Sequence, residues 1–381
     1  MSAKLYFDHA ATTPMDEEIA KKMLPYLTAD YGNADSPHSI GRAAMTAVDR
    51  ARDRVAALLN AKPSEIYFTS GGTESDNWAI FGGAYAQKKK GRNKIIVSSI
   101  EHHAVLSAAE RLQAQGVEVV YLPVNEGGRV EINALKKELS DDVGLVAVMA
   151  ANNETGVLQP IEDLCALAKQ NGALFFTDAV QYAPYERVDV KAWNVDMLSL
   201  SSHKFYGPKG CGVLYVKEGV RIEKFVAGGE QERGMRGGTL NVPAVVALAA
   251  AYEKACATME ENNGKIRSLR DTFVKELSVL EGVTFNGDVK NSIPSVVNVR
   301  FSGVDNATLL YKLDLNGVCA AAGSACASAS VKPSHVLTAM GLSEQETRSS
   351  LRFSFGKNNT EEEILLGAKI CMQAVKELRG K

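Results

Sequence analysis

The sequence has few cysteines, and they do not stand at the spacings of a disulfide framework or a zinc site. The six cysteines among 381 residues are scattered, and no two form a C-x-x-C pair. This argues against a disulfide-rich secreted scaffold and against a zinc knuckle. The first residues also lack the basic and then apolar layout of a signal peptide. We therefore expect a protein of the reducing cytoplasm.

The chain also lacks a strong net charge and a long apolar run. Lysine and arginine number 43 and acidic residues 45, so the net charge is −2 and no overall field attracts nucleic acid or an anionic membrane. No segment approaches the roughly 20 apolar residues of a membrane span. We expect neither a nucleic-acid partner nor a membrane partner.

Seven apolar segments alternate with helical ones over the first two thirds of the chain. The expected strands cover residues 66–69, 94–98, 117–122, 144–149, 173–177, 197–200 and 212–216. This alternation predicts an α/β fold with a mostly parallel seven-stranded sheet flanked by helices. Ligands bind such sheets at the carboxyl ends of the strands, which is where the polar segments of this sequence lie.

A second, smaller domain is predicted because the pattern changes after about residue 242. A long helical stretch at 242–281 leads to short strands at 296–301 and 352–355. The length of the chain also favours two cores. We predict a large ligand-binding domain over residues 15–257, and a smaller α+β domain formed by residues 1–14 and 258–381.

Lys204 has an unusual neighbourhood for a lysine. It ends the segment Ser201-Ser-His-Lys204, directly after an apolar strand and before a Gly-Pro turn. Most lysines stay hydrated on polar surfaces. A lysine at a strand end can instead lose its proton through desolvation and act as an amine nucleophile. We therefore expect Lys204 to hold a cofactor that carries a carbonyl group.

Other strand ends carry groups that suit such a cofactor. Gly71-Gly72-Thr73 stands between a strand and a helix, where free N–H groups and the helix dipole attract phosphate. His102 can stack on a planar ring and move protons near neutral pH. A metal site that pairs His102 with His103 is the alternative, but the sequence offers no third ligand nearby.

Asp178 follows another strand and can pair with a protonated ring nitrogen, although an isolated aspartate there is more often a helix cap. Gln181 can reach the same ligand or face solvent. Together with the phosphate turn, His102 and Lys204, these residues predict a pyridoxal 5′-phosphate site with Lys204 as the Schiff base.

A competing interpretation is a serine acylase of the penicillin-binding type. Ser201-Ser-His-Lys204 has the form S-x-x-K, and Ser75-Asp-Asn77 has the form S-D-N. The two motifs come in reverse order, no K-T-G element follows, and the S-x-x-K ends a strand instead of opening a helix. We rank this interpretation far lower.

Taken together, these segments resemble the cysteine desulfurases of the NifS and IscS kind, which are fold-type I pyridoxal phosphate enzymes. The likeness extends over nearly the whole chain. It is carried by residues 6–14, 69–77, 101–102, 152–154, 177–181, 201–204, 236–239 and 323–326. One departure is the loop Gly32-Asn-Ala-Asp-Ser-Pro-His38, where the family usually has Gly-Asn-Pro-Ser-Ser before its histidine.

The resemblance assigns roles around the cofactor. It implies that Asp178 pairs with the pyridine nitrogen, that Gln181 bonds the ring hydroxyl, and that His102 stacks on the ring and shuttles protons. Lys204 forms the Schiff base. The resemblance also implies a phosphate site made by Gly72, Thr73, Ser201 and His203, with Thr239 reaching over from the second subunit of a homodimer.

The resemblance likewise implies the substrate and the sulfur carrier. Asn153 and Arg352 would bind the carboxylate of L-cysteine, and Cys326 would take its sulfur as a persulfide. An acceptor protein, such as an iron–sulfur scaffold, would receive that sulfur. A free cysteine is more commonly a small buried hydrophobe, but the small residues around Cys326 favour a reactive thiol on a loop.

Two other functions remain open at this point. A different fold-type I enzyme, such as an aminotransferase or a selenocysteine lyase, would keep Lys204 without needing Cys326. An assembly or regulatory protein would keep the fold without turnover, but it would have no need of Lys204, Asp178 and His102 together.

Overall fold

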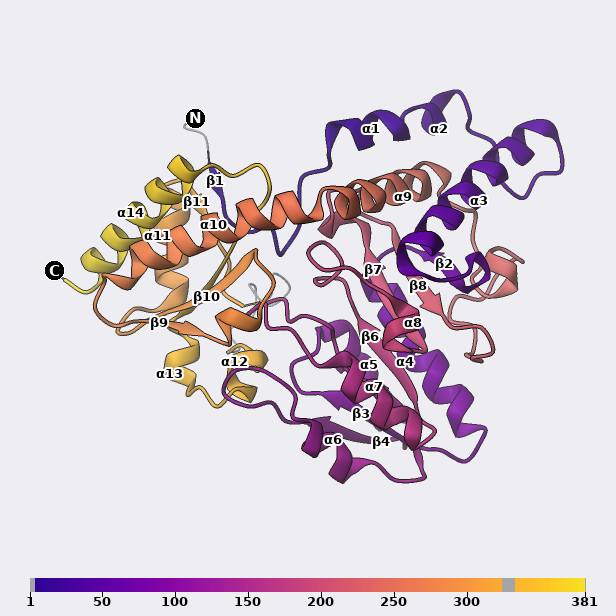
Figure 1. Cartoon of the computed structure of the whole chain (residues 1–381), viewed down its shortest axis with the longest axis horizontal. Helices are drawn as coiled ribbons and strands as arrows, with labels where there is room; N and C mark the ends of the chain where they lie inside the picture. Colours follow the sequence, from indigo (N-terminus) through magenta and orange to yellow (C-terminus); the bar gives the residue numbers. More distant parts are fainter. Residues whose placement is uncertain (1–3, 324–332, 381) are drawn as a thin grey trace.

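The computed structural model describes residues 4–323 and 333–380, so Cys326 lies outside the described residues. Figure 1 shows a large sheet with its helices on one side of the molecule and a smaller sheet with its own helices on the other. Each has a separate apolar core. The domain boundaries given above stay a prediction.

The large sheet has seven strands, as the sequence predicts. Six strands are parallel, and β8 runs antiparallel to both of its neighbours. The order across the sheet is β2 (Ile66–Thr69), β8 (Gly212–Val216), β7 (Met197–Ser201), β6 (Leu174–Asp178), β5 (Val143–Ala147), β3 (Lys94–Ser98) and β4 (Glu118–Leu122).

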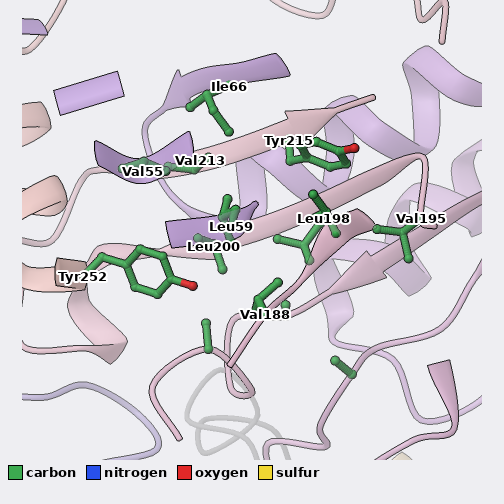
Figure 2. Packing of buried hydrophobic residues seen from close by; sticks show 14 of the residues in the cluster. Val55, Leu59, Ile66, Val188, Val195, Leu198, Leu200, Val213, Tyr215 and Tyr252 are labelled. Atoms are coloured by element: carbon green, nitrogen blue, oxygen red, sulfur yellow. The ribbon is translucent and has the colours of Figure 1, made fainter. Parts of the chain in front are cut away.

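Helices cover both faces of this sheet, because alternate residues of each strand point to opposite faces. Figure 2 shows Leu198 and Leu200 of β7 on the face that packs against α3 (Ser39–Leu59) and α9 (Val242–Ala257). Met197 of the same strand belongs to the core of the other face. That face is covered by α4 (Gly72–Lys88) and α5 (His103–Gln113), and the remaining helices of this part are α6 (Ile132–Glu138), α7 (Ile161–Gln170) and α8 (Val190–Trp193).

The smaller sheet is antiparallel and lies at the other end of the molecule (Figure 1). Its order is β12 (Ser350–Ser354), β10 (Val296–Phe301) and β9 (Val283–Asn286). The amino-terminal strand β1 (Leu5–Tyr6) pairs in parallel with β11 (Val318–Cys319), so the first residues pack with the smaller core. The helices here are α10 (Met259–Ser278), α11 (Asn306–Leu315), α12 (His335–Ala339), α13 (Glu344–Thr347) and α14 (Glu361–Leu378).

The helical stretch expected at 242–281 is two helices, α9 and α10, which meet at a bend of 71°. Thr258 lies at the break, and its Oγ1 donates a hydrogen bond to the Lys254 backbone oxygen at 3.0 Å. In the described part of the chain, no single helix is long and apolar enough to cross a membrane, whereas this bent pair passes that test of length and composition together.

Two further short helices, α1 (Glu17–Met23) and α2 (Pro25–Thr28), lead from the amino-terminal segment to α3. The sequence predicts helical structure over 16–29, and Pro25 divides it into two helices because proline begins a new helix more readily than it continues one. The short 3₁₀ turns are η1 (Pro63–Glu65), η2 (Ser202–Lys204), η3 (Glu232–Gly234) and η4 (Val289–Asn291).

Candidate active site

A pocket of about 200 Å³ lies at the carboxyl ends of β5, β6 and β7. Among the described residues, every site residue predicted from the sequence lines this pocket except Thr239. Its lining residues are Ala10, Ala11, Gly72, Thr73, Asp76, His102, Met149, Asn153, Asp178, Val180, Gln181, Ser201, His203, Lys204 and Arg352.

Lys204 lies in the turn η2, directly after β7, and its amine points to the amino-terminal segment. Nζ donates hydrogen bonds to the backbone oxygens of Ala10, at 2.5 Å, and Ala11, at 2.9 Å. Gln181 Nε2 donates to the same Ala10 oxygen at 2.8 Å. The segment that packs with the smaller core therefore forms one wall of the pocket.

Asp178 ends β6 on the floor of the pocket, where Oδ1 accepts a hydrogen bond from the Val180 backbone N–H at 2.8 Å. Burial raises the pKa of Asp178 to about 6. The hydrogen bond from Val180 and the charge of Lys204 act in the opposite direction and lower this pKa. With this pKa the carboxyl group is mainly ionised at pH 7, which suits a partner of a protonated ring nitrogen.

Asp76 is a buried site residue that the sequence analysis did not assign. It lies in the second turn of α4, and its carboxyl group accepts a hydrogen bond from Ser199 Oγ at 2.5 Å. Ser199 pairs with Asp178 between β7 and β6, so the two carboxyl groups lie near each other. Burial and the charge of Asp178 raise the pKa of Asp76 well above its usual value. The sequence signal that could have identified Asp76 is its position one helical turn after Gly72.

His102 caps α5, and its Nδ1 accepts a hydrogen bond from the Ala104 backbone N–H at 3.1 Å. Burial and the nearby charge of Lys204 lower the pKa of His102 to about 4, so the ring is neutral at pH 7. A neutral ring that accepts at Nδ1 carries its proton on Nε2. Within the described residues, no three His, Cys, Asp or Glu side chains are grouped to hold a metal ion.

The amino-terminal end of α4 forms one side of the pocket. Gly71 has φ +149°, a conformation that favours glycine, and a Cβ on Gly72 would lie 3.1 Å from Val180 Cγ2. Thr73, Ser201 and His203 line the same pocket. His203 Nδ1 lies 3.1 Å from Thr12 Oγ1, and burial lowers the pKa of His203 to about 4.

Arg352 lies on β12 and is 1% exposed. Nη2 donates to Asp8 Oδ1 at 2.7 Å, and Nη1 donates to the Asn153 backbone oxygen at 2.9 Å. The buried Nε has no hydrogen-bond partner among the described residues. The guanidinium carries five N–H donors and these two hydrogen bonds use two of them, so a guanidinium that lines a pocket is suited to binding a carboxylate.

The described cysteines do not have the properties of a reactive thiol. Cys165, Cys211, Cys256 and Cys371 are buried, and Cys319 is partly buried. Burial raises the pKa of Cys165, Cys211 and Cys371 to about 12, and it also raises the pKa of the other two thiols. None of these thiols lines the pocket.

Thr239 is exposed and does not line the pocket of its own chain. It follows Arg236, whose guanidinium donates two hydrogen bonds to Glu74 in the first turn of α4, at 2.9 and 3.1 Å. This segment is thus held against α4 by hydrogen bonds, while Thr239 itself is exposed.

The donor set of the pocket fits pyridoxal phosphate. A helix amino terminus with glycine and threonine suits the phosphate, a buried carboxyl group suits the ring nitrogen, and a lysine amine suits the aldehyde carbon. All three stand in one cavity of about 200 Å³. The residues present therefore match the group that the sequence predicts.

Known proteins share the sequence and the fold of this chain. The family model described as aminotransferase class-V matches residues 5–366. A cysteine desulfurase IscS from Clostridium botulinum is 45% identical over 382 residues, which cover 100% of this chain and 96% of that protein. A putative cysteine desulfurase IscS 1 from Bacillus subtilis is 46% identical over 378 residues, which cover 98% of this chain and 99% of that protein.

The chain belongs to the class-V aminotransferases, among the cysteine desulfurases of the NifS and IscS kind.

Solved structures of this family share the fold over almost their whole length. A NifS-like protein superimposes with a TM-score of 0.92 at 36% identity, over 97% of this chain and 98% of that one. The structure described as SspA in complex with cysteine superimposes with a TM-score of 0.82 at 34% identity, over 94% of this chain and 100% of that one. The predicted fold class and family are confirmed, and this family membership implies dependence on pyridoxal phosphate.

Proposed function

We propose that the protein transfers sulfur from L-cysteine to its own Cys326 and releases L-alanine. The observation that carries this proposal is the convergence of Lys204, Asp178, His102 and Arg352 in one pocket. When bound, pyridoxal phosphate supplies an electron-withdrawing ring that makes the α-proton of an amino acid acidic. The residues of the chain bind the substrate, move its protons and take its sulfur.

Lys204 is the proposed attachment point of the cofactor and the group that receives the α-proton. Its amine is held by the backbone oxygens of Ala10 and Ala11, which fix its direction within the pocket. Asp178 and Gln181 stand beside it as partners for the ring nitrogen and the ring hydroxyl. Gly72, Thr73, Ser201 and His203 would hold the phosphate.

His102 serves as a hydrogen-bond donor from Nε2 in this proposal. Its Nδ1 is used by the cap of α5, so the neutral ring keeps its proton on Nε2. This tautomer has no free ring nitrogen to accept the α-proton, which leaves the acceptor role to Lys204. The flat face of the same ring is available to stack on the cofactor.

Arg352 and Asn153 would bind the substrate carboxylate. The Arg352 guanidinium is already oriented by Asp8 and by the Asn153 backbone oxygen, and its buried Nε remains to be used. Orientation before binding reduces the entropy lost when the substrate binds. A charged, forked donor favours an amino acid with a free carboxylate over its amide or ester.

The sulfur step involves Cys326, whose role rests on the family resemblance. The Cys326 thiolate attacks the sulfur of the substrate and forms an S–S bond. The bond between that sulfur and Cβ breaks, and its electron pair stays on carbon, which takes up a proton and leaves as alanine. The persulfide on Cys326 then passes its outer sulfur to an acceptor protein, for which an iron–sulfur scaffold is our candidate.

We further propose that the protein acts as a homodimer. Thr239 is exposed and held next to α4 by Arg236, which suits a residue that completes the phosphate site of a second copy. Sedimentation velocity of wild type and Thr239→Ala, with cofactor titration of each, tests this. We expect a dimer in both cases and weaker cofactor binding in the variant.

The test of the activity is the release of alanine and sulfide from L-cysteine with a reductant present. Wild type and Cys326→Ala are compared after both are shown to bind the cofactor, from its visible absorption. We expect both to bind the cofactor and only wild type to turn over. Equal turnover by Cys326→Ala would leave a pyridoxal phosphate enzyme in which Cys326 takes no part.

A further inference from the structure

The amino-terminal segment that forms one wall of the pocket carries a carboxylate, Asp8, that pairs with Arg352. Asp8 Oδ1 accepts a hydrogen bond from Arg352 Nη2 at 2.7 Å, and the two side chains are 19% and 1% exposed. Among the described residues, Asp8 is the one acidic residue within ion-pair distance of Arg352. A buried guanidinium needs such a partner, because an unbalanced charge is costly away from water.

Contacts with both sheets fix the place of Asp8. It forms a backbone bridge with Ser354 of β12, and the Ala10 N–H donates to Ser354 Oγ at 2.8 Å. Further along the segment, Thr13 Oγ1 donates to the His203 backbone oxygen at 2.8 Å, in the turn η2 that follows β7. Asp8 is therefore held in place by the backbone around it as well as by its ion pair.

Of the two residues of this ion pair, Arg352 lines the pocket and Asp8 does not. A ligand carboxylate bound to Arg352 would share the guanidinium with the Asp8 carboxylate, which puts two negative charges on one positive charge. Like charges repel each other, and the repulsion is strong where water is largely excluded. Asp8 therefore orients Arg352 and at the same time weakens its hold on a ligand carboxylate.

We propose that Asp8 is a positioning residue that sets a weak affinity for the carboxylate of the amino acid. It acts through Arg352 and does not itself touch the ligand. A weak hold favours release of the amino-acid product, which carries the same carboxylate as the substrate. This inference rests on the proposed function, since it needs Arg352 to bind that carboxylate.

The test measures binding of L-alanine to the cofactor-loaded protein, from the change in visible absorption. L-Alanine is the proposed product, so its binding involves no transfer of sulfur. Asp8→Asn removes the charge but keeps an oxygen that can accept a hydrogen bond from Arg352. We expect the dissociation constant of this variant for L-alanine to be about tenfold lower than that of wild type, because one nearby like charge is gone.

Ethylamine is the matched ligand, because it is L-alanine without the carboxylate. Its affinity should be the same in wild type and Asp8→Asn, since it brings no second negative charge to Arg352. A change that merely loosened the pocket would instead weaken the binding of both ligands.

Two variants serve as controls for charge. Asp8→Glu keeps the carboxylate, so it should not show the gain in affinity for L-alanine. Asp314→Asn changes the net charge by the same amount as Asp8→Asn, but at an exposed residue that pairs with Lys4. It should bind L-alanine as wild type does.

The outcomes separate the inference from the function beneath it. Equal or weaker binding of L-alanine by Asp8→Asn would overturn the inference alone, and so would an equal gain for ethylamine. Equal binding of L-alanine by wild type and Arg352→Lys would overturn the proposed carboxylate site and the inference together. If Asp8→Asn does not fold, Asp8→Ser, which also lacks the charge and offers an oxygen, decides the question with the same two ligands.

Discussion

The backbone oxygen of Asn153 accepts a hydrogen bond from Arg352 Nη1 at 2.9 Å. Asn153 follows β5 of the large sheet, whereas Arg352 lies on β12 of the smaller one. The proposed site for the substrate carboxylate is therefore assembled from both sheets. Because the two residues are 199 positions apart in the sequence, any shift of one sheet against the other changes how the substrate is held.

Replacing Arg352 tests this site. Arg352→Lys keeps a charge but loses the fork of donors, so it should raise KM for L-cysteine by about tenfold or more, the loss of one charge-assisted hydrogen bond. Cofactor binding should change little. Steady-state kinetics and an absorption titration measure the two effects, and an unchanged KM in the variant would show that Arg352 does not bind the substrate.

Cofactor affinity should depend on pH through Asp178. Its pKa is raised to about 6 by burial, so the carboxylate that pairs with a protonated ring nitrogen is lost as pH falls through that value. We expect the dissociation constant for pyridoxal phosphate to rise between pH 7 and pH 5. Because the phosphate of the cofactor titrates in the same range, Asp178→Asn serves as the control, and an equal slope in the variant would contradict the assignment.

Glu101 should make the protein less stable as pH rises. Its side chain is fully buried, Oε1 accepts from the Met149 N–H at 2.7 Å, and burial raises its pKa to about 8. The folded protein thus holds a proton that the unfolded chain, with a pKa of 4.5, releases. The stabilisation is complete below pH 4.5 and is lost as pH rises toward 8, with a slope of up to about 1.4 kcal/mol per pH unit.

Urea unfolding of the apoprotein at pH 6 and pH 8 measures this slope. Glu101→Gln cannot release the proton, so its free energy of unfolding should fall less over the same interval. The absolute stability of the variant matters less here, because its amide must find new partners. Equal slopes for the two proteins would mean that Glu101 titrates normally.

A buried ion pair fixes the segment that leads to Thr239. Arg52 and Glu232 share two hydrogen bonds of 2.8 Å, and their side chains are 9% and 0% exposed. Glu232→Gln leaves the Arg52 charge unbalanced and should reduce the free energy of unfolding by about 3 kcal/mol. The surface pair Lys62–Glu218 provides the control, because Glu218→Gln should leave the urea midpoint unchanged.

Local sequence patterns were enough to predict the large sheet and most of the pocket. Each parallel strand is an apolar run, and such strands end at one edge, so Asp178, His102 and Lys204 could be placed together before any contact was known. No glycine or proline stands at the break at Thr258, so no strong local signal marks it. The structure explains the break, because α9 packs in a core of the large sheet and α10 packs in the core of the smaller sheet.

Residues that act through distant contacts could not be predicted from the sequence. Ala10 and Ala11 enter the pocket because they reach Lys204 across more than 190 positions, and an alanine pair carries no chemical signal. Asp76 and Glu101 look in the sequence like ordinary polar residues near turns. Only their burial, and the groups that face them, distinguish them from surface carboxylates.

The most direct test of the account is the location of sulfur after one turnover. The cofactor-loaded protein is mixed with one equivalent of L-cysteine, quenched with an alkylating agent, digested and examined by mass spectrometry. The account predicts one added sulfur atom on the Cys326 peptide, with alanine in equal amount and no change on the partly buried Cys319. Alanine released without added sulfur on Cys326, or with the sulfur on another cysteine, would contradict it.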